Sequence, residues 1–504
     1  MKKLKIIAFL LLFSVISTLV IACSDTGESK SPEDTTTAGK NGENIESEAA
    51  ETEPQRPDLP KETFGGYEFR FLSRGTNYPN DHWRVIDTVP LEEKSGDVIN
   101  DAVLLRNQYI EETYDVKISM INTVDYSAVE STARKNILAN DDFFDVFNDS
   151  ISIAGVLASQ GHLIDLKTIP YLGLSNPWWD QNANAQLSLT KKLFMTTNNM
   201  TLMDKSGTWV VLFTKGMIDK FTLEVPYDLV AQNKWTMDKM YEMATAVTYD
   251  VDGDGVMTEN DSWGLLGEPW NVNAMMAGAG TRIFSKDADD MPVFTMASER
   301  VYSAFEKAYN LMGGSGTVYL ATSDVKKTYV DIHLEHFGMM MQNNLALFYI
   351  TGMNRVFLFR GIEADFGILP NAKYNEQQES YYLNMSYGNS NCIAVPITNT
   401  DLTRTGIILE AITYESSITS YPAYIETSVR TKYTRDVESL AMLDIIYASR
   451  IFDLGHIFAW GGANTIYSNL ITSKSPDIVS NIAKSEPNIM KAMEKTLALF
   501  EELN

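Results

Sequence analysis

Strand-like and helix-like hydrophobic patterns alternate along the chain after residue 60. Apolar and polar residues alternate over Tyr67–Arg74, as in a half-buried strand. The next segment, Asp97–Tyr114, has the spacing of one helical face, with apolar residues at Val98, Ala102, Leu105 and Tyr109. Strand, helix and strand patterns follow over Asp115–Ile121, Ala133–Asp141 and Phe143–Asp149. This order predicts an α/β fold with largely parallel sheets.

The same alternation of strand and helix patterns continues in the second half of the chain. Thr208–Phe221 contains a strongly apolar strand pattern, and a helix pattern begins after Thr236, a suitable N-cap residue. Glu299–Gly314 reads as a helix closed by glycine. Short strand-like runs end at Pro370 and Pro396, and the segments beyond Asp401 are mainly helical.

The N-terminus has the pattern of an export signal. Three lysines, Lys2, Lys3 and Lys5, precede the apolar run Ile6–Ala22. The run is long enough to be an uncleaved membrane anchor, but Val20–Cys23 resembles a bacterial lipobox, which favours cleavage after residue 22 and lipidation of Cys23. Residues 23–60 are predicted to be a disordered tether, because Ser24–Pro60 has ten acidic and three basic residues and almost no large apolar side chain.

Charge and cysteine content exclude several classes of protein. The chain has 66 acidic and 41 basic residues, a net charge of −25, which argues against nucleic acid as a partner. Cys23 and Cys392 are its two cysteines, so no disulfide framework is expected. Cys392 lies in a short apolar strand pattern, where we expect a buried, unreactive thiol.

The stretch "DVDGDGVMTEND" has the spacing of an EF-hand calcium loop. Its expected ligands, in loop order, are Asp250, Asp252, Asp254, the Val256 carbonyl, Thr258 and Asp261. Aspartate stands at the last position where a longer glutamate usually binds, so we expect affinity of about 10⁻⁴ to 10⁻³ M. A helix pattern precedes the loop but strand follows it, and no second loop pairs with it. These features predict a structural Ca²⁺ rather than a sensor or a catalytic metal.

Several segments together resemble the extracellular solute-binding lipoproteins of bacterial ABC importers, in particular the sugar-type group. The resemblance is carried, in chain order, by the lipobox and acidic tether, "RNQYIEETYDVKI", "DVFND" with "LASQGHLIDL", "NPWWDQNANAQL", "TWVVLFTKGMIDKF", "KWTMDKMYEMA" and the loop running into "DSWGL". It implies a two-lobed periplasmic-binding-protein-like (type II) α/β fold, each lobe a mixed sheet flanked by helices, with the lobes joined by crossing strands.

By the same resemblance, residues 61–211 plus 387–420 form the first lobe and residues 212–386 plus 421–504 the second. The strands would cross between the lobes near Trp209, Ser386 and Tyr421. The chain would be a non-enzymatic, monomeric receptor, anchored through lipidated Cys23 at the outer face of the cytoplasmic membrane. It would enclose a carbohydrate, expected to be an oligosaccharide, between the lobes and deliver it to the permease subunits of the importer.

Candidate ligand contacts follow from the chemistry of sugars, which present apolar ring faces and rims of hydroxyls. Some candidates lie next to strand or loop ends where ligands bind open α/β sheets, and the aromatic ones could form a stacking wall. For most of them, packing in the core is the alternative. The candidates are Arg74, Asn148, Asp149, Trp178, Trp179, Asp180, Asn199, Trp209, Trp270, Asn271, Tyr349, Tyr387 and Trp460. Asn198 and Asn199 stand where related chains tend to carry Gly-Asp, which leaves a ligand-contacting carboxylate in doubt.

Two other functions stay open. A secreted glycoside-active enzyme could use a carboxylate pair across a cleft, and product formation would distinguish it. A peptide-binding member of the same fold would bind peptides without a response to sugars. The "HLEH" stretch, His333–His336, lacks the spacing of a zinc motif, so we interpret it as a solvated helix face.

Overall fold

The computed structural model describes residues 55–74, 86–123, 125–314, 316–321, 331–356, 359, 363, 365–426 and 436–502. All of them belong to one unit, Glu53–Asn504, while a second unit, Met1–Thr52, lies outside the described residues. The predicted signal peptide, Cys23 and most of the predicted tether therefore fall outside them as well. Among the described residues, no helix combines the length and apolar character needed to cross a membrane.

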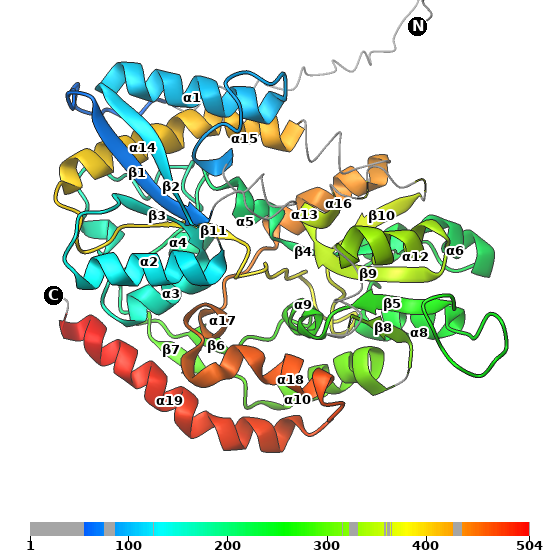
Figure 1. The fold of residues 1–504 in the computed structure, drawn as a ribbon. Helices are drawn as coiled ribbons and strands as arrows, with labels where there is room; N and C mark the ends of the chain where they lie inside the picture. Colours follow the sequence, from blue (N-terminus) through cyan, green and yellow to red (C-terminus); the bar gives the residue numbers. More distant parts are fainter. Residues whose placement is uncertain are drawn as a thin grey trace, which may run out of the picture. The chain divides into compact units, whose positions relative to one another are not determined.

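The first sheet has the strand order β11-β3-β1-β2. Its strands are β1 (Tyr67–Arg74), β2 (Val116–Thr123), β3 (Val146–Ser150) and β11 (Asn391–Ala394). β1 pairs in parallel with β2 and β3, and β11 pairs antiparallel with β3. Figure 1 shows helices α1 (Val98–Tyr114) and α14 (Leu402–Ile418) on one side of this sheet, and α2 (Tyr126–Leu138) and α3 (Ile151–Ser159) on the other.

The second sheet has the order β10-β4-β9-β5-β8. Its strands are β4 (Trp209–Thr214), β5 (Trp263–Gly267), β8 (Val318–Leu320), β9 (Ala346–Gly352) and β10 (Phe366–Leu369). β5 is parallel to β8 and β9, whereas β4 is antiparallel to β9 and β10. Helix α8 (Met237–Val247) packs on β5 and β9, and α16 (Val437–Ala448) packs on β10. Both sheets are therefore mixed, as the sequence resemblance implies.

Shorter elements connect and cover the sheets. Strands β6 (Phe284–Lys286) and β7 (Pro292–Phe294) form a two-stranded sheet. The remaining helices include α4 (Gln181–Leu187), α5 (Leu202–Ser206), α6 (Lys215–Phe221), α7 (Pro226–Ala231), α9 (Val272–Gly278), α10 (Glu299–Tyr309), α12 (Met339–Gln342), α13 (Met353–Val356), α15 (Ser420–Ala423), α17 (Leu454–Phe458), α18 (Ile466–Thr472) and α19 (Ile478–Glu502).

Three segments lie side by side where the chain passes between the sheets. Thr208, just before β4, forms an antiparallel bridge with Met385, and Leu383 forms a parallel bridge with Arg450. After Arg450, α17 packs against α3, a helix that covers the first sheet. The C-terminal region therefore contacts the first-sheet side as well as the second. The predicted lobe boundaries themselves stay a prediction.

Several sequence predictions are confirmed at the level of single elements. The predicted strand over Tyr67–Arg74 is β1, and Thr236 caps α8 by accepting a hydrogen bond from the Lys239 amide at 3.2 Å. Cys392 is fully buried on β11. The "HLEH" stretch is not a solvated face, because His336 is 5% exposed and its Nε2 lies 3.0 Å from the Tyr319 hydroxyl.

The buried face of α1 differs from the predicted one. Of the apolar residues used to predict it, Val98, Leu105 and Tyr109 are exposed. The buried stripe instead combines Ile99, Val103 and Ile110 with polar side chains, among them Arg106, whose guanidinium donates to the carbonyls of Asp87 and Thr88 at 2.9 and 2.8 Å. A pattern of apolar residues cannot reveal a face on which a buried arginine binds backbone carbonyls.

Candidate functional site

A cleft of about 1320 Å³ lies between segments of the two sheets. The first-sheet side contributes Arg74, at the end of β1, with Tyr126 and Ser152 at the starts of α2 and α3. The second-sheet side contributes Glu268 and Trp270, just after β5. These positions follow the general rule that open α/β sheets bind ligands beyond the carboxyl ends of their strands.

Arg74 is held in a fixed position on the first-sheet side. Its Nη2 lies 2.7 Å from Asp149 Oδ1 and donates to the Gly388 carbonyl at 2.7 Å. Its guanidinium carbon is 5.2 Å from the centre of the Tyr126 ring, and the Tyr126 hydroxyl is 3.0 Å from Ser152 Oγ. Asp149 is 1% exposed, so it orients Arg74 from behind rather than lining the cleft itself.

The second-sheet side combines an indole with acidic and basic groups. Trp270 is 42% exposed, while Glu268 is 5% exposed. His333 Nε2 lies 4.0 Å from Glu268 Oε2, and its Nδ1 is 2.5 Å from the hydroxyl of buried Tyr349. Asp331 and Arg355 line the same side, with 4.0 Å between Asp331 Oδ2 and Arg355 Nη1.

The crossing segments contribute the half-buried indole of Trp209, the amide of Asn384, and the rings of Tyr387 and His456. The Tyr387 and His456 rings stack with their centroids 5.3 Å apart, and the Tyr387 hydroxyl accepts a hydrogen bond from the Asp453 amide at 3.2 Å. Burial lowers the pKa of His456 and raises the pKa of Tyr387, so both rings are neutral near pH 7. Here the cleft offers flat rings and hydrogen-bonding groups with little charge.

Four of the candidates proposed from the sequence line the cleft: Arg74, Trp209, Trp270 and Tyr387. Asn271 and Tyr349 lie directly behind it. Asn271 Oδ1 accepts from the Glu268 amide at 2.6 Å, and Tyr349 contacts His333 as described above. Both are about 1% exposed, so they support lining residues.

Trp178 and Trp179 lie away from the cleft, buried around Glu410. The Trp178 indole N–H donates to Glu410 Oε1 at 2.9 Å, and that of Trp179 donates to Oε2 at 2.8 Å. The same carboxylate accepts from Asn176 Nδ2 at 2.6 Å and from the Gly173 amide at 2.9 Å. A buried acceptor with four donors thus explains an indole pair that the sequence suggested as a stacking surface.

The other candidates also have structural contacts outside the cleft lining. Asn148 donates to Thr88 Oγ1 at 2.8 Å, and the Asn199 amide donates to the Trp178 carbonyl at 3.0 Å. Asp180 caps α4 by accepting from the Ala183 amide at 2.9 Å. Trp460 is 3% exposed and donates to Thr496 Oγ1 at 2.9 Å.

Sequence reasoning missed Glu268, Asp331, His333, Arg355, Asn384 and His456, which all line the cleft. Glu268 follows β5 directly, so the strand-end rule that selected Asn148 and Asp149 could have found it. His333 lies in the first turn of a π-helix, Ile332–Gly338, whose spacing gives no amphipathic signal.

The calcium-loop residues form a partly assembled cluster. Asp250, Asp252 and Asp254 offer carboxylate oxygens that all lie within 4.8 Å of one another. Amides of Gly253 and Gly255 donate to Asp250 at 2.7 Å and lower its pKa. Asp261 lies apart, its oxygens accepting from the amides of Val251 and Thr258 at 2.8 and 2.6 Å. As predicted, a helix (α8) precedes the loop and a strand (β5) follows it.

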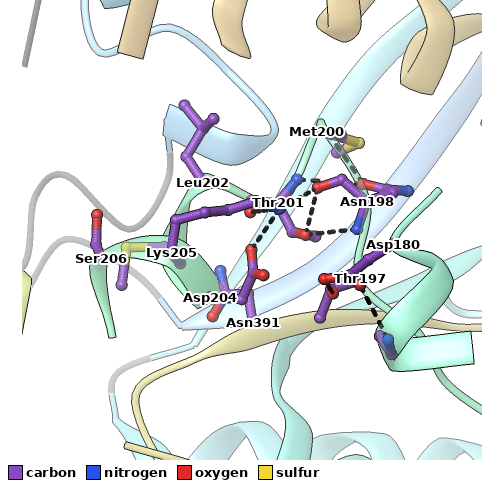
Figure 2. A network of polar contacts seen from close by, with 12 residues as sticks. Asp180, Thr197, Asn198, Met200, Thr201, Leu202, Asp204, Lys205, Ser206 and Asn391 are labelled. Atoms are coloured by element: carbon purple, nitrogen blue, oxygen red, sulfur yellow. Dashed lines mark hydrogen bonds and ion pairs between the residues drawn. The ribbon is translucent and has the colours of Figure 1, made fainter. Parts of the chain in front are cut away.

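A buried ionic cluster lies beside the crossing segments. It consists of Asp204, Lys205, Arg450 and Asp180, with Lys205 Nζ 3.0 Å from Asp204 Oδ1 and Arg450 Nη2 paired with both aspartates. Figure 2 shows the Lys205 side chain reaching back to the Asn198–Thr201 turn, where Nζ donates to the Asn198 carbonyl at 2.6 Å. Asn198 itself builds this turn, because its Oδ1 accepts from the amides of Met200 and Thr201.

Asp87 joins this region and should make stability depend on pH. Its oxygens accept from the Leu202 amide at 2.9 Å and from Asn391 Nδ2 at 3.0 Å. Burial, reinforced by the like charge of Asp204, raises the pKa of Asp87 to about 8. Between about pH 4 and 8 the folded chain therefore holds a proton that the unfolded chain releases.

The free energy of unfolding should accordingly fall as pH rises through this window, by up to about 1.4 kcal/mol per pH unit from this group. Asp87→Asn should remove that contribution, which urea unfolding at a series of pH values would detect. Asp219→Asn, an exposed change on α6, is the matched control and should leave the slope unaltered. An Asp87→Asn variant with the wild-type slope would contradict the assignment.

The sequence matches no protein-family model and no curated protein. An ABC substrate-binding protein from Listeria monocytogenes in complex with cycloalternan matches with a TM-score of 0.53 and 14% identity, over 85% of this chain and 99% of that one. A solute-binding protein of an ABC transporter from Thermotoga lettingae, bound with α-D-tagatose, matches with a TM-score of 0.54 and 12% identity, over 85% and 100%.

The chain has the two-lobed α/β fold of ABC-transporter solute-binding proteins. A third structure of this fold, UgpB from Mycobacterium tuberculosis in complex with glycerophosphocholine, matches with a TM-score of 0.53 and 13% identity, over 86% and 100%. The bound molecules of these three proteins differ in size and charge, so the likeness establishes the fold and leaves the ligand to the chemistry of the cleft.

Proposed function

We propose that this protein is the solute-binding component of an ABC importer that captures a carbohydrate, expected to be an oligosaccharide, in the cleft and delivers it to the permease. The observation that carries the proposal is the cleft itself, lined by exposed Trp270, half-buried Trp209 and buried Tyr387 together with carboxylate, amide and hydroxyl groups. Aromatic faces and convergent polar groups are the chemistry that sugar rings require. Its volume of about 1320 Å³ accommodates more than one sugar ring.

The remaining parts of the proposal come from the N-terminal sequence. Cleavage before Cys23 and its lipidation would hold the receptor at the outer face of the membrane, within reach of the permease. The receptor would act without chemical change to its ligand, opening and closing about the crossing segments.

The first test measures the melting temperature of residues 61–504 against neutral oligosaccharides, monosaccharides and short peptides. A ligand present at about 100 times its dissociation constant should add about 2.7 kcal/mol to the free energy of unfolding, which raises the melting temperature. A rise with an oligosaccharide, recovered unchanged after incubation, is the expected result. Hydrolysis would indicate an enzyme, and a response to peptides alone would indicate a peptide receptor.

We also propose that the loop Asp250–Asp261 binds a structural Ca²⁺. Three carboxylates that already lie within 4.8 Å of one another supply the hard oxygen ligands that calcium prefers. The Val256 carbonyl and Thr258 would add further oxygens, and Asp261 would need to turn from its amide partners to join them. A bound ion would relieve the repulsion among these aspartates and hold the connection between α8 and β5.

Chelation should therefore lower the free energy of unfolding by about 0.4 to 1.4 kcal/mol relative to about 1 mM Ca²⁺, given the expected affinity, and leave ligand selectivity unaltered. Thermal unfolding with EDTA and with added CaCl₂ measures the effect. Asp250→Asn should abolish the calcium response, whereas Asp219→Asn, outside the loop, should keep it. A change of ligand preference on chelation would contradict a purely structural role of the Ca²⁺.

A further inference from the structure

The charged side chains that line the described part of the cleft include more carboxylates than arginines. Three carboxylates, Asp125, Glu268 and Asp331, line it with two arginines, Arg74 and Arg355. Arg74 is held by Asp149 and the Gly388 carbonyl, each at 2.7 Å. Arg355 faces Asp331 at 4.0 Å. Both guanidinium groups therefore already have a carboxylate nearby, which reduces what they offer to an anionic ligand.

Glu268 is largely buried in the wall of the cleft, with 5% of its surface exposed. It follows β5, lines the cleft and lies two residues before Trp270, whose indole is 42% exposed. The Asn271 side chain fixes this turn by accepting from the Glu268 amide at 2.6 Å. A carboxylate beside an exposed indole attracts ammonium groups through ion pairing and cation–π contact, and it also accepts hydrogen bonds from neutral hydroxyls.

Acceptor atoms without a partner in the cleft also favour a ligand that donates hydrogen bonds. Asn384 is 1% exposed, and its Oδ1 has no hydrogen-bond partner. Asn273 Oδ1 is also buried without a partner, and both residues line the cleft. Among the described lining residues, Arg74 Nε, on the guanidinium that Asp149 holds, is the one buried donor without a hydrogen-bond partner. A ligand that satisfies both asparagines must donate hydrogen bonds, as hydroxyl and ammonium groups do and carboxylate groups do not.

We propose that the cleft selects saccharides by charge, accepting neutral and amine-bearing oligosaccharides and excluding those that carry carboxylate or phosphate groups, and that Glu268 sets this selectivity. The inference rests on the proposed carbohydrate function and adds the chemical class of the ligand. An acidic group near Glu268 would be repelled at short range, and the net charge of −25 opposes anion approach at longer range.

The test uses saccharides of equal length and linkage that differ in charge. One set is cellotriose, the glucosamine trisaccharide with the same β-1,4 linkage, and cellotriose oxidised to uronic acid at C6. A second set is maltotriose with its C6-amino and C6-carboxyl derivatives. Titration calorimetry on the chain from residue 61 should give at least about tenfold tighter binding of the neutral and amine forms than of the acidic form in the set that binds, and added salt should narrow the difference between the amine and acidic forms.

Glu268→Gln should reduce the preference for the amine over the acidic form by about tenfold, because the carboxamide keeps an acceptor oxygen and removes the charge. Glu494→Gln, an equal change of charge at an exposed position on α19, should keep the wild-type ratio. Melting temperatures without ligand verify that both variants fold.

Acidic forms that bind as tightly as the neutral ones would overturn the charge selectivity while the carbohydrate function stands. A Glu268→Gln variant with an unaltered ratio would overturn the role of Glu268. Failure of every saccharide in both sets and in the wider oligosaccharide panel would instead overturn the proposed function.

Discussion

Replacing Glu410 with leucine should lower the free energy of unfolding by about 4 kcal/mol or more. The substitution leaves four donors without their acceptor, the indole N–H groups of Trp178 and Trp179, the Asn176 amide and the Gly173 N–H. Each buried donor left unsatisfied costs about 1 to 3 kcal/mol, and partial access of water offsets some of the sum. Urea unfolding followed by tryptophan fluorescence measures the loss.

Glu410→Gln is the matched variant. Its carboxamide oxygen can still accept from one indole N–H, but its NH₂ group is a donor and cannot accept from the indole N–H of the other tryptophan. The free energy of unfolding of Glu410→Gln should therefore lie between that of wild type and that of Glu410→Leu. Ligand affinity per folded molecule should stay the same in both variants, since the cluster of Trp178, Trp179 and Tyr414 lies outside the cleft lining. A loss of stability below about 1 kcal/mol for Glu410→Leu would show that the carboxylate does not hold the indoles.

Trp270→Ala should weaken binding of the proposed saccharide ligand by roughly 30- to 150-fold, or about 2 to 3 kcal/mol. The indole is the most exposed of the lining tryptophans and supplies the largest flat apolar surface for a sugar ring. The variant should unfold like wild type, because an indole that is 42% exposed contributes little to the core. Titration calorimetry with the saccharide identified by thermal shift measures the change.

Tyr241→Ala is the control for loss of an exposed aromatic ring. Tyr241 lies on α8 at 36% exposure and outside the cleft lining, so its removal should leave affinity within twofold of wild type, about 0.4 kcal/mol. Equal affinities of the Trp270→Ala variant and wild type would remove the main support for ring stacking at this position.

The sequence predicted the fold better than the cleft. Strands such as β1 and the capped start of α8 could be found because their signals are local, an alternation of two residues or a threonine that accepts an amide N–H. The buried face of α1 could not be predicted, because Arg106 is buried through hydrogen bonds to backbone carbonyls 18 and 19 residues away in the chain. Long-range partners of a polar side chain leave no periodic trace in the sequence.

In the cleft, too, residues with local sequence signals could be predicted and residues placed by long-range contacts could not. Arg74 could be predicted because it ends a strand pattern, and Trp270 because its ring suits a stacking wall for a sugar. Trp178 and Trp179 have the right chemistry for a sugar, and from the sequence we expect core packing of at least one of them. Their common acceptor, Glu410, is more than 230 residues away in the chain, so the sequence could not show that both are buried around it. His333 belongs to a π-helix turn, whose irregular spacing hides which side chains share a face.

The bridged crossing segments would constrain how the proposed receptor opens. Because Thr208 pairs with Met385 and Leu383 pairs with Arg450, bending any one segment strains the hydrogen bonds of the others. Arg450 also forms an ion pair with Asp204 in α5, just ahead of β4, so we expect the crossing segments to move together. Under the proposed function, ligand release would then require a collective rotation of whole lobes, a motion of microseconds to milliseconds, rather than the faster fluctuation of a single loop. Residence time would depend on the stiffness of these segments as well as on contacts in the cleft.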